Sequence, residues 1–297
     1  MSVAAYAGAT DTGRKRRRNE DAYVVAPPLF AVADGMGGAQ AGEVASKLAA
    51  TVLEDTDSGS LSGRERVNAL FQEANKRVYD RAAVDPSASG MGTTMTVALI
   101  EGSEVTIGHV GDSRAYLVRD GKLEQLTDDH SLVNELMKSG KLSPEEAETH
   151  PQRSVITRAL GTDPDVDVDA FTIEAKEGDV FLICSDGLTA MVDDAAILEV
   201  VESNHDDLKK ATKSLVAAAN RGGGEDNITV VAFTIADADV GGDTAEMDAV
   251  VEMEETKEAA QPPRPEVSSA TARARLVLTM LGLLTIAAVL LVWGLLR

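Results

Sequence analysis

The chain has 297 residues, of which 44% are hydrophobic, enough for one large domain or two smaller ones. It has 28 basic and 49 acidic residues, and the net charge of −21 argues against general nucleic-acid binding, which needs a basic surface. The one cysteine, Cys184, excludes a disulfide framework and indicates an intracellular folded part.

Short runs rich in Val, Ile, Thr and Leu predict β-strands at 29–33, 93–100, 105–110, 115–118, 180–184 and 228–235. Apolar residues at helical spacing predict helices at 41–55, 64–83, 131–139, 194–202 and 206–220. Ser143-Pro144-Glu145-Glu146 predicts another helix start, with Ser as N-cap and the second Glu reaching back to it. Strands and helices do not alternate strictly, so the predicted class is α+β rather than a doubly wound parallel sheet.

The composition divides the chain into three segments. Residues 1–236 read as one continuous globular domain, and 237–275 as a disordered linker rich in Asp, Glu and Pro. Residues 276–296 carry no charge, and 21 residues suffice to cross roughly 30 Å of hydrocarbon as a helix. The alternative for this stretch is a buried core helix. Arg273 and Arg275 precede it, so the positive-inside rule predicts a single-pass cell-membrane protein with a cytoplasmic N-terminal part.

Four aspartates stand where predicted strands end or begin, and these are Asp34, Asp112, Asp186 and Asp226. A carboxylate at the end of a buried strand is held firmly, which suits a ligand for a hard cation. The alternative for each one alone is turn chemistry, because Asp-Gly is a common turn pair. Four such sites, with a further acidic pair at Glu20-Asp21, favour a metal site.

Taken together, the motifs resemble those of the metal-dependent protein phosphatases, the type 2C Ser/Thr phosphatases, in their bacterial branch. The matching segments occur in the family's order: Asp11-Thr12-Gly13, Arg16-Arg17-Arg18-Asn19-Glu20-Asp21, Ala33-Asp34-Gly35-Met36-Gly37-Gly38, Gly92-Thr93-Thr94, Gly111-Asp112-Ser113-Arg114, Ser185-Asp186-Gly187 and Gly224-Glu225-Asp226-Asn227. The stretch 150–161 resembles the flap region of the bacterial members. One motif alone is weak, whereas the ordered set covers nearly all of residues 1–236.

The resemblance implies a four-layer α-β-β-α sandwich of two antiparallel sheets flanked by helices. It also implies two Mn²⁺ or Mg²⁺ ions that activate a water for phosphoester hydrolysis. Asp34 would bridge both ions, the Gly35 carbonyl would bind one of them, and Asp186 and Asp226 would hold the other. Glu20 would act through ordered water.

The resemblance further implies that Arg16 grips the substrate phosphate with its planar fork. Many relatives have a histidine two residues after the bridging aspartate as a candidate proton donor, and here that residue is Met36. A third ion would rest on Asp112 and Asp186, yet bacterial relatives tend to add an acidic residue where this chain has Ala190.

Other phosphatase and hydrolase classes fit less well. A cysteine-based phosphatase needs an arginine six residues after its cysteine, and Cys184 is followed there by Ala190. A phosphoaspartyl enzyme needs a second aspartate at Met36, and an aromatic content of 3% is low for stacking on sugars in a glycosidase. A catalytically silent phosphoprotein-binding relative and a membrane-anchored scaffold without metal remain as non-enzymatic alternatives.

The expected partners are phosphorylated proteins. A terminal membrane helix would confine the domain near membrane Ser/Thr kinases and their substrates, with no nucleic acid among its ligands.

Overall fold

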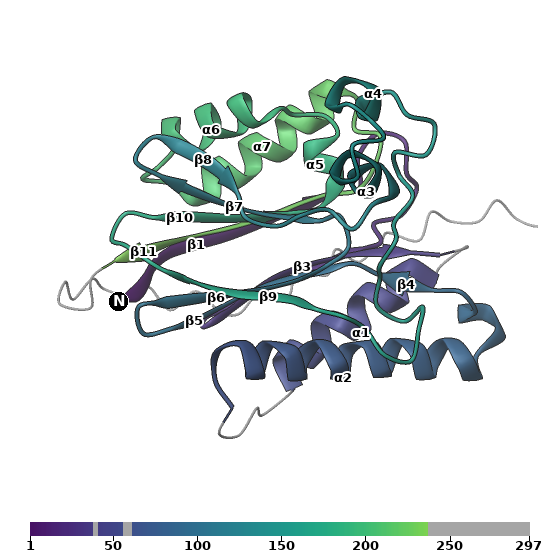
Figure 1. The fold of residues 1–297 in the computed structure, drawn as a ribbon. Helices are drawn as coiled ribbons and strands as arrows, with labels where there is room; N and C mark the ends of the chain where they lie inside the picture. Colours follow the sequence, from purple (N-terminus) through teal and green to yellow (C-terminus); the bar gives the residue numbers. More distant parts are fainter. Residues whose placement is uncertain (38–40, 56–60, 237–297) are drawn as a thin grey trace, which may run out of the picture. The chain divides into compact units, whose positions relative to one another are not determined.

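Two antiparallel sheets pack face to face in the computed structural model, which describes residues 1–37, 41–55 and 61–236 (Figure 1). The first sheet has the order β1 (Ser2–Asp11), β11 (Ile228–Ala236), β10 (Val180–Cys184), β7 (Arg114–Arg119) and β8 (Lys122–Gln125). The second has the order β2 (Asp21–Ala26), β3 (Leu29–Met36), β5 (Met95–Glu101), β6 (Glu104–Val110) and β9 (Asp169–Glu174), and the short β4 (Gly92–Thr93) pairs with β3. All neighbouring strands run antiparallel.

Helices cover the outer faces of both sheets. The second sheet is covered by α1 (Ala41–Asp55) and α2 (Gly63–Val84), which a 3₁₀ turn (Pro86–Ala88) follows. The first sheet is covered by α6 (Asp194–Ser203) and α7 (Leu208–Gly222), with the one-turn α5 (Asp186–Thr189) after β10. The short α3 (Leu132–Lys138) and α4 (Pro144–Glu148) lie on the long connection from β8 to β9. The prediction of two antiparallel sheets flanked by helices is therefore confirmed.

The core between the sheets is apolar and partly aromatic. Phe30 of β3 stacks on Phe233 of β11 with ring centroids 4.4 Å apart, and Phe181 of β10 stacks on the same ring at 5.1 Å. All three rings are at most 1% exposed. Strands packed by a sheet on one face and a helix on the other are buried on both, which explains why most appeared as continuous apolar runs.

Several local predictions are confirmed. The apolar face predicted for α7 is buried and consists of Leu208, Ala211, Thr212, Leu215, Val216 and Ala219. At the start of α4 the Glu146 backbone N–H donates to Ser143 Oγ, and the Ser143 backbone N–H donates to Glu146 Oε2 at 2.9 Å. This reciprocal pair is the predicted capping box.

The sequence patterns missed β1, β2, β8 and β9. β1 is rich in alanine, a residue with little preference for strands, and it is held by its pairing with β11. β9 is an edge strand with mostly half-buried residues, so it lacks a strong apolar run.

In the part of the chain that the structure describes, no helix is long and apolar enough to span a bilayer. The predicted linker 237–275 and the predicted span 276–296 lie outside the described residues.

The buried side chain of His109 should make the free energy of unfolding depend on pH. The buried ring of this β6 residue lies 2.9 Å from Thr96 Oγ1 through Nδ1 and 3.2 Å from the Asp128 carbonyl through Nε2. Burial, with His130 alongside, lowers the pKa of His109 to about 3. The unfolded chain therefore gains a proton near pH 6.5 that the folded chain does not take up, so stability is lost as the pH falls from about 6.5 toward 3.

We expect urea unfolding to show this loss relative to the variant His109→Gln. Between pH 6 and pH 5 the stability difference between the two proteins should change by about 1 kcal/mol in the variant's favour. Parallel stability curves would contradict the prediction.

Candidate active site

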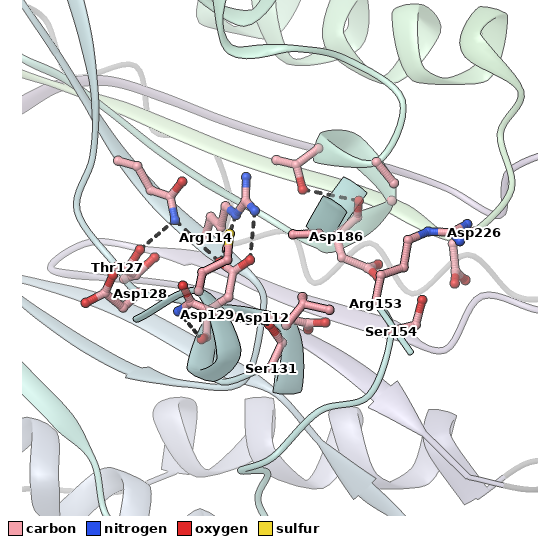
Figure 2. A pocket seen from close by; sticks show the side chains of 18 of the residues that line it. Asp112, Arg114, Thr127, Asp128, Asp129, Ser131, Arg153, Ser154, Asp186 and Asp226 are labelled. Atoms are coloured by element: carbon pink, nitrogen blue, oxygen red, sulfur yellow. Dashed lines mark hydrogen bonds and ion pairs between the residues drawn. The ribbon is translucent and has the colours of Figure 1, made fainter. Parts of the chain in front are cut away.

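The predicted aspartates meet at one end of the sandwich. They come from both sheets: Asp34 lies near the end of β3, Asp112 follows β6, Asp186 begins α5 directly after β10, and Asp226 precedes β11. The carboxyls are close enough for Asp186, Asp112 and Asp226 all to raise the pKa of Asp34. Asp112, Asp186 and Asp226 also line one pocket of about 880 Å³, shown in Figure 2. The structure thus gathers side chains that are up to 192 positions apart in the sequence, from Asp34 to Asp226.

The electrostatics of this cluster favour bound cations. Loss of water around Asp34 raises its pKa well above the usual range, and the neighbouring aspartates raise it further. Burial and the charge of Asp186 raise the pKa of Asp112 to about 8. The pKa values of Asp186 and Glu20 are raised as well, by burial first and by Asp226 in addition. Carboxylates that repel one another in this way are stabilised when a divalent cation neutralises them.

Asp21 is a site residue to which the sequence analysis assigned no role. It faces Asp34 in the pairing of β2 with β3, and its side chain is buried. Its Oδ2 accepts hydrogen bonds from Ser185 Oγ at 2.9 Å and from Thr229 Oγ1 at 2.6 Å, whereas its Oδ1 has no partner in the part of the chain that the structure describes. Burial raises the pKa of Asp21 to about 7, although both hydroxyls lower it. The pairing Glu20-Asp21 was the sequence signal that could have suggested this position.

Replacing Thr229 by valine tests how this carboxylate is held. Thr229→Val keeps the shape of the side chain but removes a donor from a buried carboxylate, which should cost about 1–3 kcal/mol of unfolding free energy. Urea unfolding at neutral pH measures the change. The matched control is Thr106→Val, because Thr106 is also a buried strand residue but, among the described residues, its side chain bonds only the Thr172 hydroxyl, at 3.1 Å. Equal losses in both variants would contradict a special role for Thr229.

The loop before β2 carries Arg16, whose guanidinium donates to Asp226 Oδ2 at 2.6 Å. Asn227 fixes the backbone of this loop. Its Nδ2 donates to the carbonyls of Thr12 and Arg18, both at 2.9 Å, and its Oδ1 accepts from the Glu20 N–H at 2.7 Å. The side chain of Arg16 is half exposed, so it can reach a ligand at the pocket while its backbone stays in place.

Two observations indicate that the site fits divalent cations. First, Asp186 Oδ1 and Asp21 Oδ1 are buried oxygens without a hydrogen-bond partner among the described residues. Second, a side-chain carbon at Gly42 would lie 2.7 Å from the Gly35 carbonyl oxygen and 2.8 Å from Glu20 Oε2, so both oxygens face one small space that only glycine leaves open. Oxygen donors alone are the set that Mg²⁺ and Mn²⁺ prefer.

Among the described residues, no three His, Cys, Asp or Glu side chains form a ready-made metal cage. This agrees with the mutual repulsion of the carboxylates, which keeps them apart, and with the ion pair that engages Asp226 with Arg16. It leaves the ligand assignment of Asp34, Gly35, Asp186, Asp226, Glu20 and Asp112 as a prediction.

The backbone of Asp34 is held independently of any ion. Its N–H donates to Thr94 Oγ1 at 3.0 Å, and its carbonyl accepts from Thr93 Oγ1 and from the Thr94 N–H, each at 2.9 Å. The Thr94 hydroxyl in turn bonds Ser113 Oγ at 2.8 Å, next to Asp112. The motif Gly92-Thr93-Thr94 therefore positions the central carboxylate.

The pocket beside the carboxylates is open and bordered by the connection that carries α3 and α4. On one side of the pocket, Arg114 forms a bidentate ion pair with Asp129, from Nε to Oδ1 at 2.8 Å and from Nη2 to Oδ2 at 2.7 Å. Arg153 and Ser154 line the side toward Asp226 (Figure 2). Ala190 also lines this pocket and offers no ligand for a third ion.

Cys184 has no place in this chemistry. Its side chain is fully buried at the end of β10, and burial raises the pKa of the thiol to about 12. The neutral thiol is a poor nucleophile at physiological pH, which agrees with a structural role.

A family profile described as protein phosphatase 2C matches residues 13–221, more than half of the chain and including most of the site. The chain belongs to the protein phosphatase 2C family. Its curated relatives include serine/threonine protein phosphatases of bacteria. The serine/threonine phosphatase stp of Listeria innocua is 42% identical over 233 residues, which is 75% of this chain and 92% of the relative.

The serine/threonine protein phosphatase PstP of Mycobacterium tuberculosis is 41% identical over 241 residues. This match covers 80% of the present chain but only 46% of PstP, so the chain spans about half the length of that relative. The PhpP protein phosphatase of Streptococcus pneumoniae is 39% identical over 77% of the chain.

Solved structures of phosphatases share the fold. The crystal structure of the M. tuberculosis phosphatase PstP has a TM-score of 0.75 at 40% identity, covering 79% of this chain and 100% of the other. A second structure of the PstP catalytic domain, with a TM-score of 0.73 at 38% identity, is a complex with two manganese ions and covers 80% of this chain and 100% of that one. The two manganese ions of that structure agree with the predicted cofactor, a pair of Mn²⁺ or Mg²⁺ ions.

Proposed function

We propose that this chain hydrolyses phosphoserine and phosphothreonine in proteins with the help of two divalent cations. The observation that carries the proposal is the convergence of Asp34, Asp186 and Asp226 with Arg16 beside an open pocket. Asp34, Asp186 and Asp226 would supply carboxylate ligands, with the Gly35 carbonyl and Glu20 completing the set. When bound, Mn²⁺ or Mg²⁺ supplies an activated water and neutralises charge on the phosphoryl group.

The protein's own groups orient the substrate. Arg16 would hold two phosphate oxygens with its fork, at a place fixed by the backbone bonds from Asn227. The pocket along α3, α4 and Arg153 would receive the peptide on either side of the phosphorylated residue. Met36 has no proton to give, so the leaving alcohol would take its proton from water or from a group other than this side chain.

Hydrolysis of a phosphothreonine peptide by the full chain tests the proposal. Release of phosphate should require Mn²⁺ or Mg²⁺ and stop when EDTA removes the ions. Metal-dependent binding of the peptide without turnover would instead identify a catalytically silent relative. A protein that binds neither metal nor phosphopeptide would support the scaffold alternative.

We further propose that the phosphatase is tethered to the cell membrane with its catalytic domain in the cytoplasm. The support is the uncharged run 276–296 and the arginines before it. Fractionation of bacteria that express the chain should find it in carbonate-washed membranes, and a chain stopped after residue 275 should be soluble. Equal solubility of both chains would contradict the tether.

A membrane-tethered phosphatase would meet membrane Ser/Thr kinases and their substrates, which we propose as its partners. Phosphoproteomics of a deletion strain would show their phosphothreonines accumulating. Unchanged kinase phosphorylation would rule out this class of substrate.

A further inference from the structure

The outer face of α7 carries a stripe of basic side chains. Lys209, Lys213 and Arg221 recur at multiples of four residues, so they lie on one face of the helix, with Lys210 beside them. All four are exposed, whereas the opposite face of α7 packs on the sheet. The stripe is a concentration of positive charge on a chain whose net charge is −21.

The stripe borders two adjoining hollows. One hollow of about 370 Å³ is bordered by Lys209, Lys210, Lys213 and Ala217. A second, of about 490 Å³, is bordered by Lys213, Ala217, Arg221 and Arg14 together with the residues 8–11 of β1. The two hollows share Lys213 and Ala217 and therefore adjoin, and we call this surface the α7 groove.

The basic side chains of the groove lack an ion-pair partner in the described part of the domain. Among the described residues, Arg14, Lys209, Lys210, Lys213 and Arg221 form no ion pair. Two acidic residues border the groove, and both carboxylates bond locally. Asp207 accepts from the Lys210 N–H, and Asp11 accepts from the Gly13 N–H and from Asn220 Nδ2. The groove therefore carries five basic and two acidic side chains, a net charge of +3, which favours an acidic ligand.

The chain itself contains a matching acidic segment. Residues 237–254, which lie outside the described residues, have seven acidic side chains and no Lys or Arg: Asp237, Asp239, Asp243, Glu246, Asp248, Glu252 and Glu254. From the opposite charges we propose that this segment binds in the α7 groove of its own molecule.

The direction of the strands places the start of the segment near the groove. Gly8 pairs with Val231 and Asp11 pairs with Ile228, and the second half of α7 borders this same part of β1. The first turn of α7, with Lys209, consequently lies toward the other end of β1, where Ser2 pairs with Ala236, the residue before the acidic segment.

Length and linkage favour binding within one molecule. Eighteen extended residues reach up to about 60 Å, whereas the fifteen residues of α7 span about 22 Å. Attachment at Ala236 keeps the segment at an effective concentration on the order of millimolar, which compensates for the small contribution of each exposed ion pair. The interaction must weaken as salt screens it. Binding of the acidic segment in the α7 groove does not require the chain to be an active phosphatase.

Lysine labelling of the full chain in detergent tests the proposal. The wild type is compared with a variant that has the seven acidic residues replaced, D237N/D239N/D243N/E246Q/D248N/E252Q/E254Q. Brief acetylation followed by mass spectrometry should modify Lys209, Lys210 and Lys213 at least about threefold more slowly in the wild type at low salt. The difference should vanish at about 0.5 M NaCl. Lys122 and Lys141, exposed lysines outside the groove, should react equally in both proteins.

A second experiment replaces the lysines of the α7 groove and measures the accessibility of the acidic segment. In K209E/K210E/K213E, a glutamate-specific protease should cut after Glu246 and Glu252 faster than in the wild type, and the control K122E/K141E should be cut at the wild-type rate. Equal labelling in the two proteins of the first comparison would overturn the proposal. So would protection that rises with protein concentration, which indicates a second copy, or protection that needs phosphatidylglycerol vesicles and persists without the acidic residues.

Discussion

The variant Asp34→Asn is expected to hydrolyse a phosphothreonine peptide at least about 10³-fold more slowly than the wild type, measured as kcat at saturating Mn²⁺. The amide keeps the shape of the side chain but loses the charge that would neutralise the bound cations. The backbone of residue 34 stays in place, because its hydrogen bonds come from Thr93 and Thr94. The loss therefore reports the carboxylate rather than a rearranged strand.

Asp128→Asn is the matched control. Asp128 lines the same pocket, and its side chain is 67% exposed and pairs with Lys138 at 2.9 Å. The same chemical change there should leave kcat within about twofold, because exposed ion pairs contribute little. Equal losses in both variants, or full turnover by Asp34→Asn, would rule out the proposed role of Asp34.

Asp34→Asn should also change stability in a direction that depends on metal. Burial and the neighbouring aspartates raise the pKa of Asp34 in the folded state, so its ionised form opposes folding above the pKa of the unfolded chain. Removing the charge should raise the Tm of the EDTA-treated protein near pH 8. With Mn²⁺ present the order should reverse, because the wild type binds the ions more tightly. A variant that is less stable than the wild type under both conditions would indicate a packing defect.

The second large effect is expected for Arg16→Lys, which should lower kcat/KM for the phosphopeptide about 100-fold. Lysine keeps the positive charge but loses the planar fork that can bind two phosphate oxygens. Inhibition by inorganic phosphate should weaken in parallel. Arg17→Lys is the control, because Arg17 is the next residue of the same exposed loop. Wild-type kcat/KM in Arg16→Lys would show that Arg16 does not hold the phosphate.

The domain's local structure could be largely predicted from its sequence. The buried face of α7 and the capping box at Ser143 depend on residues within a few positions of one another, and both are present. The position of Asp186 just after β10 was also readable, because a continuous apolar run followed by Ser-Asp-Gly marks the end of a strand buried on both faces. The same pattern ended the strand too early at Asp34, because β3 continues to Met36.

β1 is an element that local sequence patterns did not predict. Its alanines have little preference for a strand, and the strand exists because β11 pairs along almost its whole length. Asp21 shows the same limit in the site. The hydroxyls that hold it belong to Ser185 and Thr229, which are 164 and 208 positions away in the sequence.

The sequence by itself predicted which oxygen-bearing residues gather at the pocket, and it pointed to the family, because those motifs are short and ordered along the chain. Only the tertiary structure decided that Asp21 lies among them, that Arg16 pairs with Asp226, and that Glu20 and the Gly35 carbonyl face one space beside Gly42. The physical reason is that carboxylates acquire raised pKa values and metal-binding character from charges brought close by two sheets. The distance between those charges is a property of the packed sandwich and of no single segment.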